Sequence, residues 1–240
     1  MTVGLDLPVP ASALAVAAHP DDVEFGCGGT LAKWAAAGCV VHHVVCTDGS
    51  KGTWDPDEDI EALRATRQDE QRAAAIALGA TGEQVFLGWT DGELASGLAE
   101  RSEVARAIRR LQPEVVLGHD PWKRYRLHPD HRHAGFLAIE GVVAARDPFF
   151  FPEHDLAPHR PETILLWEAD EVDHVEDISS SFDVKIGALL EHRSQFVTTH
   201  GITDPDDDAQ VARFRRWLDE VHTEAGRSVG VRWGEAFKRL

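Results

Sequence analysis

The chain has 240 residues, a formal net charge of −17 and 43% hydrophobic residues. A protein this acidic should repel phosphate backbones and anionic lipid, so we expect no nucleic acid and no membrane among its partners. Its hydrophobic content excludes disorder by composition. Three cysteines without a CxxC pair, and an apolar run at 11–18 without a basic flank, indicate a reduced, cytoplasmic protein with no signal peptide.

Short apolar runs alternate with helical patterns along the chain. Strands are predicted at 14–18, 40–46, 84–87, 115–118 and 163–167, and helices at 28–37, 63–78, 99–111, 131–146, 182–193 and 209–223. This alternation predicts an α/β fold: one Rossmann-like domain over 1–240, with a mostly parallel sheet and helices on both faces. Ligands of such sheets bind beyond the carboxyl ends of the strands. The Pro- and Phe-rich segment 147–160 is expected to be a surface excursion that rims the site.

The first candidate motif, Ala18-His19-Pro20-Asp21-Asp22, follows the first predicted strand directly. One interpretation is an ordinary strand-to-helix loop, because Asp favours helix starts. A second is a dinucleotide fingerprint, but the glycine spacing after Asp22 does not fit, and the two carboxylates would oppose a pyrophosphate. A third is a metal site, because His and Asp together supply nitrogen and oxygen ligands suited to zinc.

The second candidate motif is His128-Pro129-Asp130-His131, on the loop that follows the fourth predicted strand. His-Pro-Asp thus occurs twice, each time beyond the carboxyl end of a strand, and loops from two strands of one sheet can converge there. Three protein ligands and an open position for water are typical of catalytic zinc. His19, Asp22 and one histidine of the second motif would complete such a site. His119 is near this position without an assigned role.

These residues resemble the PIG-L/LmbE-like zinc-dependent N-acetylglucosaminyl deacetylases. The two His-Pro-Asp motifs carry the resemblance, and weaker matches at 67–79, 87–92, 192–195 and 235–237 extend it over most of the chain. The resemblance implies a hydrolase that removes an N-acetyl or other N-acyl group from an amino sugar or its glycoside. It further implies Zn²⁺ as cofactor, although iron(II), cobalt or manganese would also suit two histidines and one aspartate.

The resemblance also implies a role for each residue of the two motifs. His19, Asp22 and His131 would hold the zinc, and Asp21 would act as general base. His128 would face the developing oxyanion, and Asp130 would orient His128 and raise its pKa.

Two further residues, Arg67 and Asp91, resemble the family's sugar-hydroxyl binders. The competing interpretations are a surface ion pair of Arg67 with Asp69 or Glu70, and a turn residue for Asp91. Some family members have a tyrosine two positions before the second motif, where this chain has Arg126. Help from that loop with the oxyanion is therefore in doubt, and the role of the basic, aromatic loop 122–126 stays open.

Other functions are compatible with parts of this pattern. An amidase acting on a larger N-acyl thiol-sugar conjugate would keep the metal site and change the substrate. A nucleotide-binding oxidoreductase would need no metal. A metal-binding module without catalysis would lose only stability, and no turnover, on Asp21→Ala. The exposed run Phe149-Phe150-Phe151 could pack against a second copy in a homo-oligomer.

Overall fold

A computed structural model describes residues 3–240. Its eight strands form one sheet in the order β1-β7-β8-β6-β5-β2-β3-β4. Neighbouring strands are parallel, except that β8 runs antiparallel to both β6 and β7. The strands are β1 (Gly4–Leu5), β2 (Ser12–Ala17), β3 (Val40–Thr47), β4 (Gln84–Trp89), β5 (Val115–His119), β6 (Thr163–Trp167), β7 (His174–Asp177) and β8 (Gly234–Arg239). The predicted α/β class with a mostly parallel sheet is confirmed.

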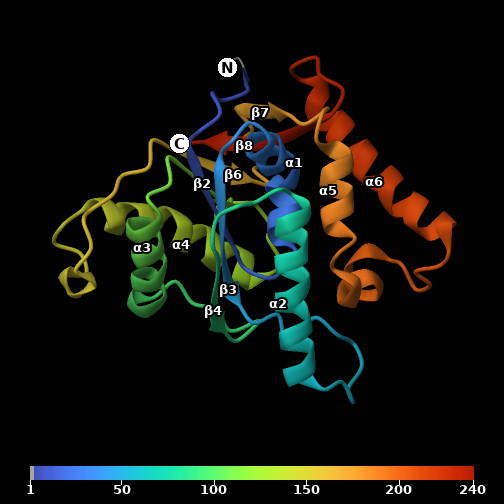
Figure 1. Cartoon of the computed structure of the whole chain (residues 1–240), viewed down its shortest axis with the longest axis horizontal. Helices are drawn as coiled ribbons and strands as arrows, with labels where there is room; N and C mark the ends of the chain where they lie inside the picture. The colour runs from blue at the N-terminus through green and yellow to red at the C-terminus, as the bar shows by residue number, and fades with distance from the viewer. Residues whose placement is uncertain (1–2) are drawn as a thin grey trace.

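Helices cover both faces of the sheet, as the alternation predicted (Figure 1). Helices α3 and α4 lie on one side, and α1, α2, α5 and α6 lie on the other. The helices are α1 (Asp22–Ala36), α2 (Ile60–Ala77), α3 (Leu98–Leu111), α4 (Pro129–Arg146), α5 (Phe182–Leu189) and α6 (Asp208–Arg227), with short helical turns η1 (Pro152–His154), η2 (Arg193–Gln195) and η3 (Phe196–His200).

The central strand β2 shows why the core has two layers. Side chains alternate between the faces of a strand. Leu14 and Val16 pack in the cluster that α3 and α4 contribute to, while Ala15 packs with Leu31 and Trp34 of α1. Because both faces are buried, β2 is apolar from Ala13 to Ala17. Polar groups can therefore appear only where it ends, at His19.

Helix α1 is interrupted at Cys27, whose φ of −148° is not helical. The carboxylate of Glu235 on β8 accepts hydrogen bonds from the backbone N–H groups of Gly29 and Thr30, at 2.9 and 2.7 Å. Lys185 on α5 donates to Oε1 of Glu235 at 2.6 Å and to the carbonyl of Phe25 at 2.7 Å. A buried ion pair thus satisfies the backbone groups that the kink leaves without helical partners.

The excursion 147–160 does not rim the site, contrary to expectation. It lies beside α3 and α4 (Figure 1), where the buried guanidinium of Arg109 donates to the carbonyls of Ala144, Asp147 and Phe150, among others. None of its residues lines the large cavity described below. Phe149 at its tip is 90% exposed.

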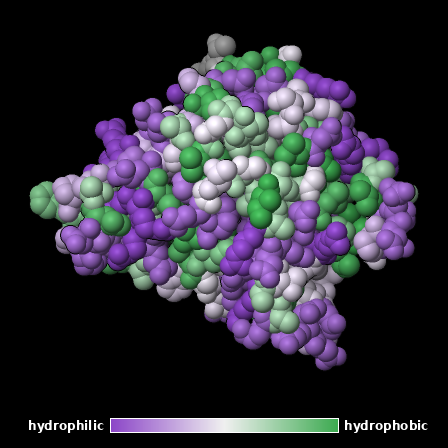
Figure 2. Space-filling model, in the orientation of Figure 1, coloured by the Kyte–Doolittle hydropathy of each residue, from purple (hydrophilic) through white to green (hydrophobic). Residues whose placement is uncertain are grey.

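Figure 2 shows hydrophilic side chains spread over one face, with hydrophobic patches between them. Within residues 3–240, no helix is both long and apolar enough to cross a membrane.

Candidate active site

The two His-Pro-Asp motifs lie together at the carboxyl edge of the sheet. His19 follows β2, and His128 immediately precedes α4, on the loop after β5. Both line one cavity of about 590 Å³. Of the other predicted site residues, the same cavity is lined by Asp21, Asp22, Arg67, Asp91 and His131. Asp130 is fully buried behind this wall.

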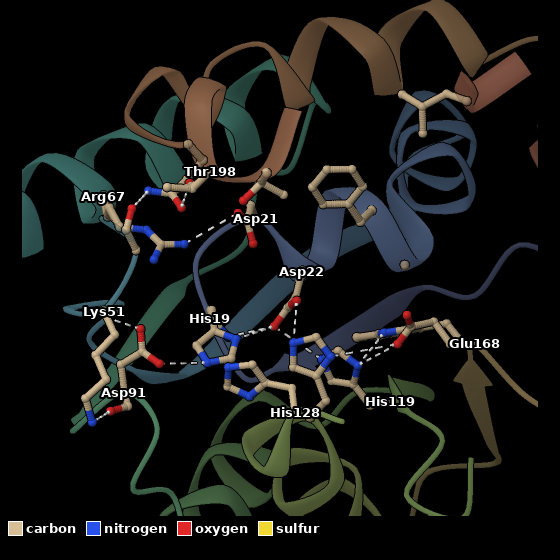
Figure 3. A pocket seen from close by; sticks show the side chains of 18 of the residues that line it. His19, Asp21, Asp22, Lys51, Arg67, Asp91, His119, His128, Glu168 and Thr198 are labelled. Atoms are coloured by element: carbon tan, nitrogen blue, oxygen red, sulfur yellow. Dashed lines mark hydrogen bonds and ion pairs between the residues drawn. The ribbon is translucent and has the colours of Figure 1, made fainter. Parts of the chain in front are cut away.

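Asp22 lies at the centre of a cluster that it forms with His19, His119 and His131. Its two carboxylate oxygens face the three imidazoles (Figure 3). Oδ2 lies 3.3 Å from Nδ1 of His19 and 3.3 Å from Nε2 of His119. Oδ1 lies 3.3 Å from Nε2 of His131. Burial opposes the charged carboxylate, but His131 and His119 hold the pKa of Asp22 well below its usual range.

His19 is surrounded by carboxylates on its other side. Its Nε2 lies 3.2 Å from Asp91 and 3.2 Å from Asp130. Burial opposes a charge on the imidazole, yet Asp130, Asp22 and Asp91 together raise the pKa of His19 well above its ordinary value. Asp91 is itself held at a pKa of about 2, because the contact with His19 outweighs its burial. This concentration of negative charge favours a cation at the cluster.

Asp21 points into the cavity from a strained backbone position, with φ at 102°. Its N–H donates to Oε1 of Gln71 at 2.9 Å, and its carboxylate lies 3.4 Å from the guanidinium of Arg67. Burial raises the pKa of Asp21 to about 6, against the lowering effect of Arg67. Neither of its contacts involves Asp22 or a histidine of the cluster, so its carboxylate is available to a ligand in the cavity.

The anchors of Asp21 come from α2 and are buried. Arg67 is 3% exposed and donates to the carbonyls of Pro20 and Gly49, at 2.6 and 2.9 Å. The interpretation of Arg67 as a surface ion pair is therefore wrong. Gln71 continues the network through Glu24, which in turn contacts Nε2 of His192 at 3.2 Å.

The structure corrects the expected pairing of Asp130 with His128. Asp130 accepts hydrogen bonds from the N–H groups of Gly92 and Leu94, at 2.6 and 3.2 Å, and contacts His19. Among the described residues it makes no hydrogen bond to His128. Burial and the neighbouring His19 lower the pKa of His128, and the opposing effect of Asp130 does not reverse this. Asp130 therefore positions His19 and the loop after β4.

The donor set suits a divalent metal ion. Within residues 3–240, three groups offer ligand atoms within 4.8 Å of one another: His19–His128–His131, His19–Asp91–His128–Asp130 and Asp22–His119–His131. Of the predicted ligands, His19 and His131 belong to the first group, and Asp22 and His131 belong to the third. Burial holds the pKa of His131 at about 4, so that its imidazole is neutral and able to ligate.

Two residues around the cluster, Glu168 and Trp167, were not identified from the sequence, and a third, Arg126, was named there without a role. Glu168, directly after β6, lies 3.3 Å from Nδ1 of His119 and 4.0 Å from Nδ1 of His131. Arg126 donates to Glu168 at 2.5 Å and approaches Nδ1 of His131 at 3.2 Å. Trp167 donates to His119. Like His19, Glu168 is a polar residue directly after a predicted strand. The same criterion could therefore have identified it from the sequence.

Comparisons of sequence and of structure identify relatives of this chain. Residues 14–142 match the family described as "PIG-L: GlcNAc-PI de-N-acetylase". A diacetylchitobiose deacetylase of Thermococcus kodakarensis is 37% identical over 94% of this chain and 81% of its own length. A solved N,N'-diacetylchitobiose deacetylase of Pyrococcus horikoshii, complexed with an inhibitor, superposes with a TM-score of 0.86 at 32% identity, covering 96% of this chain and 84% of that one. A 4-oxalmesaconate hydratase of Pseudomonas putida is 32% identical over 74% of this chain and 71% of its own length.

The fold and the site define an enzyme of the N-acetyl-sugar deacetylase class, which acts on amide bonds. The family match covers more than half of the chain, and the Thermococcus relative covers nearly all of it. The chain belongs to the PIG-L family.

Proposed function

We propose that this protein is a zinc-dependent hydrolase that removes the N-acetyl group from an N-acetylglucosamine-containing sugar. One observation carries the proposal: the Asp21 carboxylate faces the cavity directly beside a cluster of histidines and Asp22 that suits a metal ion. An amide hydrolase needs these two parts, a place for an electrophile and a base for water.

His19, Asp22 and His131 would hold the ion, with Glu168 behind His131. When bound, zinc polarises the amide carbonyl and lowers the pKa of a water molecule to about 7. These roles rest on the family resemblance and on the contacts of Asp22 with both histidines.

Asp21 would take the proton of the attacking water on its carboxylate and return it to the leaving amine. Gln71 and Arg67 fix its backbone and side chain, so that the base is preorganised. His128, exposed at the cavity wall, would donate a hydrogen bond to the oxyanion from a ring N–H.

The sugar would lie over Lys51, Asp91 and Arg67. The backbone N–H of Lys51 donates to Oδ2 of Asp91 at 3.0 Å, and all three residues line the cavity. Charged groups of both signs at one wall suit a ligand with many hydroxyl groups. A larger N-acyl thiol-sugar conjugate is the alternative substrate for the same site.

Metal analysis combined with acetate release tests the proposal. We expect about one zinc per chain, and release of acetate from diacetylchitobiose or another N-acetylglucosamine derivative. Release should stop after chelation and return on adding Zn²⁺. Because a hydratase is among the relatives, the assay must detect acetate itself and not only loss of substrate. Protein never exposed to chelator that contains no metal would contradict the proposal.

A further inference from the structure

One part of the cavity has no function in the proposed deacetylation of an acetyl group. Beyond the cluster, the cavity is lined by an apolar limb, which we define as Phe25, Trp217, Leu218 and Val221. On α6, Val221 is four positions after Trp217 and three after Leu218, and side chains at these spacings are neighbours on a helix. Phe25 faces them from α1, with its ring 6.3 Å from that of Trp217.

The apolar limb begins directly at the catalytic cluster. Phe25 is one helical turn after Asp21, and its N–H donates to the Asp21 carbonyl at 3.1 Å. Gly26 lies so close to the indole of Trp167 that a Cβ there would meet it at 2.6 Å. Trp167 in turn contacts His119, with ring centroids 4.7 Å apart. A ligand at the cluster can therefore extend along Gly26 and Trp167 into the limb.

The limb presents apolar surface that the fold itself does not bury. Trp217 is 49% exposed and Val221 is 46% exposed, although both line the cavity. Covering such surface with an apolar ligand removes it from water and so favours binding. The limb residues offer no charged side chain, so a hydroxyl-rich sugar ring has few partners there.

The two ends of the cavity thus differ in chemistry. Lys51, Arg67 and Asp91 lie on one side of His19, and His119 and Glu168 lie on the other (Figure 3). The apolar limb adjoins the second side, through Trp167 and Gly26. An amide at the cluster has its sugar on the nitrogen and its acyl chain on the carbonyl carbon. With the sugar on the polar side, the acyl chain points toward the limb.

We infer that the apolar limb binds the acyl chain of the substrate, and that the enzyme hydrolyses N-acyl amino sugars with chains longer than acetyl. The inference rests on the proposed function. Water adds to the carbonyl carbon, the C–N bond breaks, and the products are a fatty carboxylate and the free amino sugar.

The test is a series of methyl glucosaminides with N-acetyl, N-butanoyl and N-hexanoyl groups. For the unmodified protein, we expect kcat/KM for the hexanoyl compound to exceed that for the acetyl compound by about tenfold or more, because four added methylene groups leave water. Val221→Asp should reduce this ratio at least tenfold. Val184→Asp is the matched control, because Val184 is 40% exposed on α5 and does not line the cavity; it should keep the ratio.

A wild-type ratio well below one, or an unchanged ratio in Val221→Asp, would overturn the inference. The inference would also be overturned if kcat/KM rose with an apolar aglycone and not with a longer acyl chain. Phenyl and methyl glycosides of N-acetylglucosamine test this, because the limb would then bind the aglycone. If no compound is hydrolysed, the proposed function fails. Titration calorimetry with the hexanoyl and acetyl compounds then tests the limb separately: tighter binding of the hexanoyl compound supports it, and equal binding contradicts it.

Discussion

The indole N–H of Trp167 donates to Nδ1 of His119 across 2.9 Å. The Glu168 carboxylate also lies 3.3 Å from this Nδ1, and the contacts with Asp22 and Glu168 raise the pKa of His119 against the effect of its burial. On the other side of the ring, Nε2 of His119 lies 3.3 Å from Oδ2 of Asp22. His119 therefore lies between the carboxylates of Asp22 and Glu168, and the indole N–H of Trp167 helps to fix the orientation of its ring.

Removing that N–H should weaken the metal site without unfolding the protein. Trp167→Phe keeps an aromatic ring against Gly26 but removes the N–H that orients His119, and loss of such an outer contact typically costs about 10- to 100-fold in metal affinity or activity. Zinc affinity, measured by competition with a chelator, checks this. Trp233→Phe is the control, because Trp233 also donates an indole N–H at 2.9 Å, to Asp219. Equal effects in the two variants would contradict this role of the Trp167 N–H.

Asp21→Asn should abolish most turnover and leave the metal in place. General bases contribute about 10²- to 10⁴-fold to rate, and asparagine tolerates the positive φ of this position. The measurements are kcat for acetate release and zinc content. Asp155→Asn provides a matched control, since Asp155 also has a positive φ, of 52°, and is remote from the cluster. An Asp21→Asn protein that lost zinc would instead place this carboxylate in a metal-holding role.

Breaking the buried pair of Lys185 and Glu235 should strongly destabilise the fold. Lys185→Met leaves the Glu235 carboxylate buried without its cation, a change that costs about 3–5 kcal/mol. Urea denaturation measures the free energy of unfolding. Arg72→Met, which breaks the exposed pair with Asp69, should cost less than about 1 kcal/mol. Adding Glu235→Gln to Lys185→Met should recover part of the loss, and no recovery would argue against an uncompensated charge.

Acid should destabilise the protein partly through His200. Burial among Phe25, Phe196 and Phe214 lowers the pKa of His200 to about 4. The folded-state pKa lies below the unfolded value of about 6.5, so the unfolded state binds more protons in this window. Stability is therefore lost as the pH falls from about 6.5 to 4, by at most about 3 kcal/mol.

His200→Phe should flatten this pH dependence of the free energy of unfolding, which denaturation at several pH values measures. His159→Phe, on the opposite side of the sheet, controls for the loss of a histidine in general. An unchanged slope in His200→Phe would mean that other groups carry the acid sensitivity.

The sequence predicted the parts of the fold that are encoded locally. The apolar runs at β2, β3, β5 and β6 are buried on both faces and stand out from their surroundings. The strands β1, β7 and β8 were not predicted. β8, with the sequence GEAFKR, alternates weakly and carries charges, and it becomes a strand only because β6 and β7 supply backbone partners on both sides.

The sequence by itself also determined that the two motifs lie close together. His19-Pro20-Asp21-Asp22 and His128-Pro129-Asp130-His131 each follow a strand, and the carboxyl ends of these strands meet at one edge of the sheet. Only the tertiary structure decided which atoms face each other. It turned Asp130 toward His19, placed Arg67 against Asp21, and brought Trp217 of α6 opposite Phe25. Contacts between residues far apart in the chain depend on how helices pack over the sheet, and spacing along the sequence carries no record of that packing.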